Sequence, residues 1–192
     1  MHDTPEPVDG SAYGEMIAQL RLFLDAVTYT RPDAATLADL QRQLAEMTSR
    51  LGARHPEDDR TIAARQRLPS RGRAMIPPCV MTKRSPGTGE GSVVFGAHFL
   101  GRNGAAHGGA IAALFDEALG VMVNSPQDPR ARTAFLHVDF HRIAPIDRPL
   151  QVRAEVFESV GRKRRVRGSL SDGEDVCATA EALFIVLRDG QP

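Results

Sequence analysis

Residues 101 to 120, GRNGAAHGGAIAALFDEALG, constrain the fold most, because a glycine-rich loop here runs directly into an apolar helical pattern. Apolar side chains recur at the helical period of 3.6 residues, at Ile111, Leu114, Phe115, Ala118 and Leu119. The small residues between them leave room for neighbouring backbone to come close. We therefore expect a core helix that is clasped by a sheet.

The start of this helix is suited to a chemical role. Its first turn leaves backbone N–H groups without intrahelical partners, and the macrodipole adds roughly half a positive charge there, so a developing oxyanion would be stabilised. Gly108 and Gly109 have no Cβ to obstruct an incoming carbonyl group. Asp116 follows His107 by nine residues, a rise of about 13 Å, so one helix does not bring the two side chains together. A site shared between two copies of the chain would bring His107 of one copy close to Asp116 of the other.

Composition sets the class of protein. The chain has 192 residues, 42% hydrophobic and 25% charged, which suits one globular domain with an extension. Its 24 basic and 24 acidic residues give no net charge, so we expect neither a nucleic-acid nor a membrane partner. The first ten residues have no signal-peptide pattern, and Cys79 and Cys177 form neither a metal-ligand spacing nor a disulfide framework. We expect a cytoplasmic protein.

The N-terminal part predicts two amphipathic helices. Apolar residues repeat at helical spacing through residue 29 or so, and again, after a turn at 30–33, at Leu37, Leu40, Leu44, Met47 and Leu51. We predict a helical hairpin extension over 1–54, packed on its own domain in preference to a partner chain. A polar, proline-containing linker over 55–78 and a main domain over 79–192 follow.

The main domain is predicted to be α+β. We expect a short edge strand at 79–83, a glycine-rich turn at 85–91 and a strand at 93–100 before the core helix. Four strands follow it, at 132–142, 149–160, 162–172 and 175–187, with alternating apolar residues and turn-rich boundaries. This order places one long helix against an antiparallel sheet that has one covered face.

Residues 79–187 resemble the hotdog-fold acyl-CoA thioesterases, especially the PaaI-like branch. The carrying residues are HGGAIAALFDEALG at 107–120, Thr133 and HVDFHRIAPIDRPL at 137–150. The resemblance implies a hotdog fold, in which a sheet of about five to six strands wraps the helix. It also implies an acyl-CoA substrate, no cofactor, and a homodimer or dimer of dimers with sites at the seam.

The same resemblance implies roles for single residues. Asp116 matches the carboxylate that activates water or attacks directly, and His107 with Gly108 and Gly109 matches the element that polarises the carbonyl. Thr133 matches a hydroxyl that supports the carboxylate or the water. Thr133 is, however, an even number of residues before His137 and Asp139, so a regular strand would point all three side chains to the same face, away from the helix. A β-bulge would be needed to turn Thr133 towards the helix.

Asn103 and a group of arginines are candidate substrate contacts outside the helix motif. Some family members carry Asn six residues before the His; here that position is Gly101, and Asn103 lies nearby as a candidate contact. Arg162, Arg164 and Arg165 belong to a dense basic run. It is either a charged strand edge that blocks unwanted pairing or a clamp for the nucleotide phosphates of coenzyme A.

Other interpretations stay open. A non-catalytic acyl-CoA sensor on the same fold would not need a carboxylate beside the thioester. Asp116 could be an ordinary surface residue, as Glu117 is expected to be from its position about 100° around the helix, and His107 could be a simple helix cap. His137, Asp139 and His141 share a strand face, but a solvated face gives this pattern without metal, so we expect no metal site.

Overall fold

The computed structural model describes residues 10–51, 68–85, 87–124, 130–188 and 190–191; the predicted linker lies partly outside these ranges. Two helices come first, α1 (Gly10–Tyr29) and α2 (Ala34–Leu51), followed by the 3₁₀ turn η1 (Pro69–Gly72). The main domain then contains β1 (Cys79–Ser85), β2 (Thr88–Val94), the 3₁₀ turn η2 (Ala97–Phe99), α4 (Gly108–Val123), β3 (Ala131–Phe140), β4 (Pro149–Val160), β5 (Lys163–Asp172) and β6 (Asp175–Val186).

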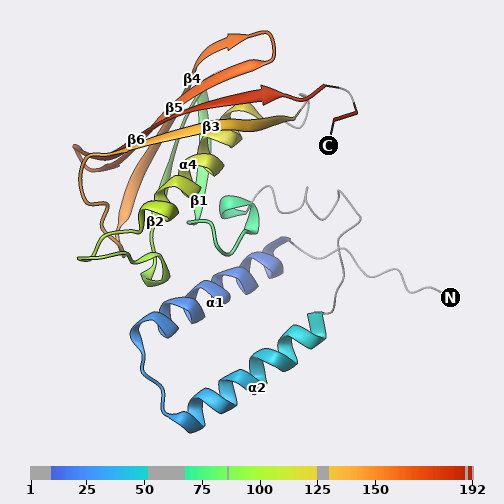
Figure 1. The fold of residues 1–192 in the computed structure, drawn as a ribbon, viewed down its shortest axis with the longest axis vertical. Coiled ribbons are helices and arrows are strands. Elements are labelled where there is room, and N and C mark those ends of the chain that lie inside the picture. The colour runs from blue at the N-terminus through green and yellow to red at the C-terminus, as the bar shows by residue number, and fades with distance from the viewer. Residues whose placement is uncertain (1–9, 52–67, 86, 125–129, 189, 192) are drawn as a thin grey trace, which may run out of the picture.

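The six strands form one antiparallel sheet in the order β1-β2-β4-β5-β6-β3. Helix α4 lies along one face of this curved sheet, and β1 and β3 are its two edge strands (Figure 1). This is the α+β hotdog fold that the sequence predicted. No helix within the described ranges is long and apolar enough to cross a membrane.

Small residues on the sheet make a seat for α4. Ala154, Gly168 and Ala180 lie side by side on β4, β5 and β6. A Cβ on Gly168 would come within 2.9 Å of Leu119 and 3.3 Å of Phe115, both fully buried on α4. The glycine therefore lets the helix approach the sheet backbone closely.

The N-terminal helices differ in how they are held. Helix α1 packs on the main domain: Ile17 is buried, Arg21 donates to the carbonyls of residues 73, 74 and 76, and Asp25 binds both the N–H and the Nδ1 of His98 at 2.8 and 2.6 Å. Helix α2 has no buried residue. In Figure 1 it is the outermost element, with α1 between it and the sheet.

Two local predictions around β2 were wrong. The strand predicted at 93–100 begins earlier and ends at Val94, and residues 97–99 form η2. Of the stretch 85–91 predicted as a turn, the part from Thr88 on is instead the first half of β2, where a Cβ on Gly89 would lie 2.7 Å from the sulfur of Met122; the turn itself lies between Ser85 and Thr88 and contains Gly87, with φ of 80°. Gly89 serves close packing under α4 and Gly91 close packing against β1, and local sequence patterns do not distinguish such glycines from those of a turn.

Candidate active site

His107 is the N-cap of α4. Its backbone is extended, and its Nδ1 accepts a hydrogen bond of 3.0 Å from the N–H of Gly109. Its own N–H donates to the Phe99 carbonyl at 2.7 Å, which fixes the loop against η2. Because Nδ1 is the acceptor, a neutral ring carries its proton on Nε2, and the imidazole is exposed. His107 can thus cap the helix through Nδ1 and still present its exposed Nε2–H to a ligand.

The N–H available to a ligand is that of Gly108. The sequence analysis assigned oxyanion stabilisation to Gly108 and Gly109 together, but the N–H of Gly109 is taken by the His107 ring. Gly108 is half-buried, and its N–H has no acceptor among the residues that the structure describes. It lies beside the exposed ring of Phe140, which a Cβ on Gly108 would approach to 3.3 Å. The first turn of α4 therefore presents one free donor at the positive end of the helix dipole.

Asp116 is exposed on α4 and is tied to β3. Its Oδ1 accepts a hydrogen bond of 2.7 Å from the Thr133 hydroxyl. Thr133 can reach it because the register of β3 against β6 shifts between Thr133 and Phe135, which leaves Ala134 as an extra residue. Thr133 consequently pairs with inward-facing Phe184 and shares its side of the sheet. The β-bulge that Thr133 needs in order to face the helix is therefore present.

Glu117, predicted to be a surface residue, is buried. Its side chain is 4% exposed, and its carboxylate accepts hydrogen bonds from Nε and Nη2 of Arg71 in η1, with the Nε bond at 2.6 Å; Arg73 approaches it to 3.4 Å. The pairing raises the pKa of the Arg71 guanidinium, chiefly through the hydrogen bond to Glu117. The missed signal was position: Glu117 falls about 60° from Leu114, inside the apolar sector of the helix.

The turn η1 has an unusual backbone that serves this contact. Ser70, Arg71 and Gly72 all have positive φ, at 48°, 54° and 67°. The Ser70 hydroxyl, buried, donates to the Pro77 carbonyl at 2.5 Å and accepts from the Cys79 N–H at 3.0 Å. These bonds and the Arg71–Glu117 pair offset the cost of left-handed backbone in non-glycine residues.

Asn103 lies in a tight turn ahead of α4. Asn103 and Gly104 have φ of 56° and 72°, and the Ala105 N–H donates to the Arg102 carbonyl at 3.0 Å. An Asn-Gly pair is favoured wherever two successive residues need positive φ. The backbone therefore accounts for this residue, and its role as a substrate contact stays a prediction.

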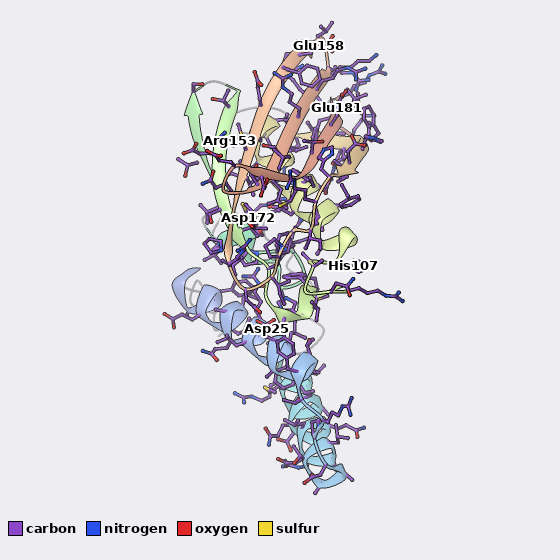
Figure 2. All side chains as sticks on the ribbon, turned by 90° about the vertical axis from the view of Figure 1, so that its left-hand side faces the viewer. Asp25, His107, Arg153, Glu158, Asp172 and Glu181 are labelled. Carbon is purple, nitrogen blue, oxygen red and sulfur yellow. The ribbon has the colours of Figure 1, made fainter. Side chains whose placement is uncertain are left out.

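The predicted arginine clamp lies away from His107 of the same chain. Arg165 pairs with Glu158 and Glu181 at 3.0 Å each, whereas Arg162 donates to the Val186 carbonyl and Arg164 to those of Gly161 and Lys163. Figure 2 shows Glu158 at the far end of the sheet from His107. The structure does not bring these groups together within one chain, and the clamp stays a prediction.

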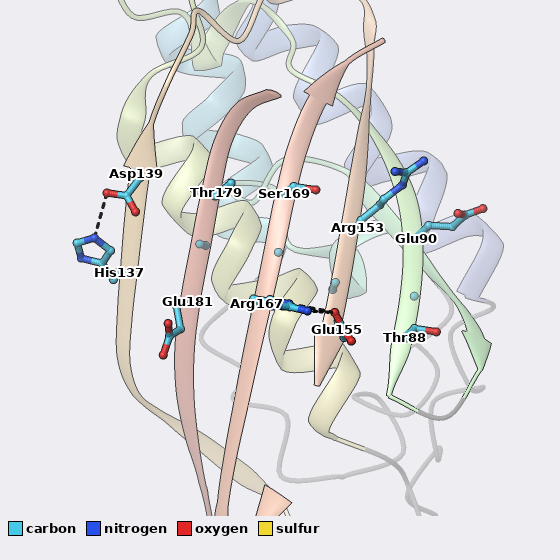
Figure 3. A pocket seen from close by; sticks show the side chains of 14 residues that line it. Thr88, Glu90, His137, Asp139, Arg153, Glu155, Arg167, Ser169, Thr179 and Glu181 are labelled. Atoms are coloured by element: carbon cyan, nitrogen blue, oxygen red, sulfur yellow. Dashed lines mark hydrogen bonds and ion pairs between the residues drawn. The ribbon is translucent and has the colours of Figure 1, made fainter. Parts of the chain in front are cut away.

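The face of the sheet opposite α4 is polar and hollowed. A depression of about 760 Å³ is lined by residues of five strands, including His137, Asp139, Arg153 and Arg167 (Figure 3). His137 bonds Asp139 at 3.1 Å, and His141 instead bonds Thr179 at 2.8 Å. Within the described ranges no group of three His, Cys, Asp or Glu side chains is arranged to hold a metal ion.

Neither cysteine is activated as a nucleophile. Burial raises the pKa of the Cys79 thiol to about 12, with a smaller contribution from the charge of Glu117, and burial also raises the pKa of Cys177. Both thiols are therefore protonated near neutral pH, and a protonated thiol is a poor nucleophile.

This geometry can be compared with known proteins. Residues 103–179 match the family model of the thioesterase superfamily. A crystal structure of a thioesterase superfamily protein aligns with a TM-score of 0.74 and 25% identity, over 95% of this chain and 97% of the other. A search of curated proteins gave no match.

Two further structures share the fold at lower identity. The PaaI protein of the E. coli phenylacetic acid degradation operon aligns with a TM-score of 0.53 and 18% identity, over 57% of this chain and 80% of PaaI. A Streptococcus mutans UA159 protein bound to acetyl-CoA aligns with a TM-score of 0.52 and 18% identity, over 57% and 88% of the two chains. The resemblance to hotdog thioesterases is therefore confirmed, and the matches support thioesterase function in general terms.

Proposed function

We propose that the protein is an acyl-CoA thioesterase that hydrolyses the thioester to a free acid and coenzyme A. The observation that carries the proposal is the Asp116 carboxylate, which the Thr133 hydroxyl holds at 2.7 Å because a bulge in β3 turns Thr133 towards α4. A carboxylate fixed in this way is suited to act on water. The acetyl-CoA-bound Streptococcus mutans protein supports a CoA thioester as the ligand class.

The proposed reaction uses two helix positions. Asp116 takes a proton from a water molecule, whose oxygen attacks the thioester carbonyl carbon. The oxyanion is stabilised by the Gly108 N–H and the α4 dipole. The C–S bond then breaks, and the departing sulfur receives the proton that Asp116 holds, so the carboxylate is regenerated. Direct attack by Asp116, with an anhydride that water then hydrolyses, would use the same residues.

The site is proposed to form between two copies. Gly108 and Asp116 are eight residues apart, about 12 Å along one helix, which is too far for both to act on one carbonyl. Strand β3, which carries Thr133, is an edge strand with an exposed Phe135 and Phe140. Pairing of two β3 edges would join the sheets and bring Asp116 of one copy towards the helix start of the other.

The test is Asp116→Asn, which keeps the volume and one hydrogen-bonding oxygen but can neither accept the proton nor attack. We expect kcat/KM on the best substrate of an acyl-CoA panel to fall about 10²- to 10⁴-fold, with acyl-CoA binding retained. The panel runs from acetyl to palmitoyl and aromatic thioesters, and free thiol release is measured.

The matched control is Asp139→Asn, an exposed carboxylate on the opposite face of the sheet, which should leave kcat/KM unchanged. Wild-type activity in Asp116→Asn would refute the mechanism. Binding without hydrolysis across the whole panel would instead favour the acyl-CoA sensor.

A further inference from the structure

The helical hairpin formed by α1 and α2 has an apolar surface that no other element among the described residues covers. On α2, Leu37, Leu44, Met47 and Leu51 are 54%, 40%, 48% and 69% exposed, and no residue of this helix is buried. On α1, Met16, Leu20 and Val27 are 44%, 39% and 52% exposed and lie about 60° to 100° around the helix from Ile17, which faces the main domain. An apolar groove of about 1100 Å³ lies between the two helices.

The spacing of these residues fits another helix. With Leu40, the α2 residues recur at intervals of 3, 4, 3 and 4, and Met16, Leu20, Phe23 and Val27 on α1 recur at intervals of 4, 3 and 4. These are the a and d positions of a heptad, whose side chains insert between those of a facing helix. A small ligand or a membrane surface does not require this regularity.

The distribution of charge fits a second copy of the same hairpin. The two apolar stripes contain no acidic or basic residue, and the positions that flank the α2 stripe are Thr36, Gln41, Gln43, Thr48 and Arg50. The charged residues Asp39, Arg42 and Glu46 bind one another on the opposite side of α2. An identical hairpin can therefore face this surface without like-charge repulsion, whereas flanking charges normally select a different partner.

The hairpin supplies most of the area that a stable interface takes. Helices of 20 and 18 residues are about 30 and 27 Å long and present a face about 10 Å wide each, so the hairpin offers on the order of 600 Å². A stable interface takes about 800 Å² from each partner, and pairing of the β3 edges would add to the total. The similar structure with a TM-score of 0.74 aligns over 95% of this chain, so a comparable arm is present there.

We infer that the α1–α2 hairpin is a self-association surface, which packs against the same hairpin of a second copy to form an antiparallel four-helix bundle. Arg21 and Asp25 hold α1 on the main domain, so the bundle would fix how two hotdog domains are oriented. This inference does not depend on the thioesterase activity.

The test compares two substitutions to glutamate in the full-length chain. Leu44→Glu places a charge in the apolar stripe, and Ala38→Glu places the same charge on the far side of α2, one turn before Arg42. Mass and dissociation constant are measured by sedimentation and mass photometry over dilution from micromolar to nanomolar. Circular dichroism checks that both variants fold.

We expect Leu44→Glu to lower the assembly mass, or to raise the dissociation constant by about tenfold or more, while Ala38→Glu behaves as wild type. A monomeric wild-type protein would overturn the inference, as would equal mass and equal dissociation constant in wild type and Leu44→Glu. The second result would mean that the stripe binds a different protein.

Discussion

The hydrogen bond from Thr133 to Asp116 links the proposed reactive group to the sheet. An exposed carboxylate on a helix has several rotamers, and a donor at 2.7 Å selects one of them. The hydroxyl also stabilises the ionised form that acts as a base. Thr133 is therefore best described as a positioning residue.

Thr133→Val removes this donor and keeps the side-chain shape. If the proposed function holds, kcat/KM should fall about 10- to 100-fold, because a hydrogen bond to a charged group contributes roughly 1.5 to 3 kcal/mol. Thr133→Ser, which keeps the hydroxyl, should retain most of the activity. Equal losses in both variants would point to packing in place of the hydrogen bond, and equal activities would remove Thr133 from the site.

Glu117, the neighbour of Asp116, has a structural role. Its carboxylate is buried beside η1 and Cys79, where an unpaired charge is costly, and Arg71 supplies the compensating charge. The pair also fastens η1 to the core helix, and η1 contains the left-handed residues 70–72.

Arg71→Met should lower the free energy of unfolding by about 3 kcal/mol, since removal of one partner leaves a buried charge. Arg73→Met is the control: that side chain is 57% exposed and 3.4 Å from Glu117, so its loss should cost about 1 kcal/mol or less. Urea unfolding measures both. Combining Arg71→Met with Glu117→Met should recover much of the stability, and a double variant as weak as the single one would contradict this account.

At the scale of elements, α4 carries both halves of the proposed chemistry but separates them. Its first turn offers the free Gly108 N–H, and its middle offers Asp116. The helix packs closely on small residues of three strands, which resists the bending that would bring Gly108 and Asp116 together. The edge strand β3, with its bulge at Ala134, contacts Asp116 through Thr133. Its free edge can therefore join a second copy close to Asp116.

At the scale of the whole molecule, a shared site can be tested by mixing inactive variants. Asp116→Asn lacks the proposed base, and Gly108→Val crowds the proposed oxyanion position, so each should be nearly inactive alone. In a mixed dimer one of the two sites receives neither substitution. Unfolding and refolding the variants together should restore up to about a quarter of the wild-type activity, given random pairing.

The controls are each variant refolded alone and circular dichroism of Gly108→Val, whose added side chain would meet Phe140. No recovery in a mixture shown to contain mixed dimers would place the whole site within one chain.

The sequence by itself determined the elements and their order. Helical spacing located α1, α2 and α4, and alternation with turn residues located the four strands after α4 to within a few residues, because these signals are local. The motif at 107–120 also indicated the hotdog fold and Asp116. The glycines of β2 misled, since a glycine needed for close packing and one needed for a turn look alike in sequence.

Tertiary structure decided which side chains meet. Glu117 is buried because Arg71 arrives from a segment 46 residues away, and Thr133 reaches Asp116 because one residue of β3 has no partner in β6. Gly108, not Gly109, has the free N–H because the His107 ring turns back onto its own helix. Each of these depends on contacts between distant parts of the chain or on one rotamer, and local periodicity carries no information about either.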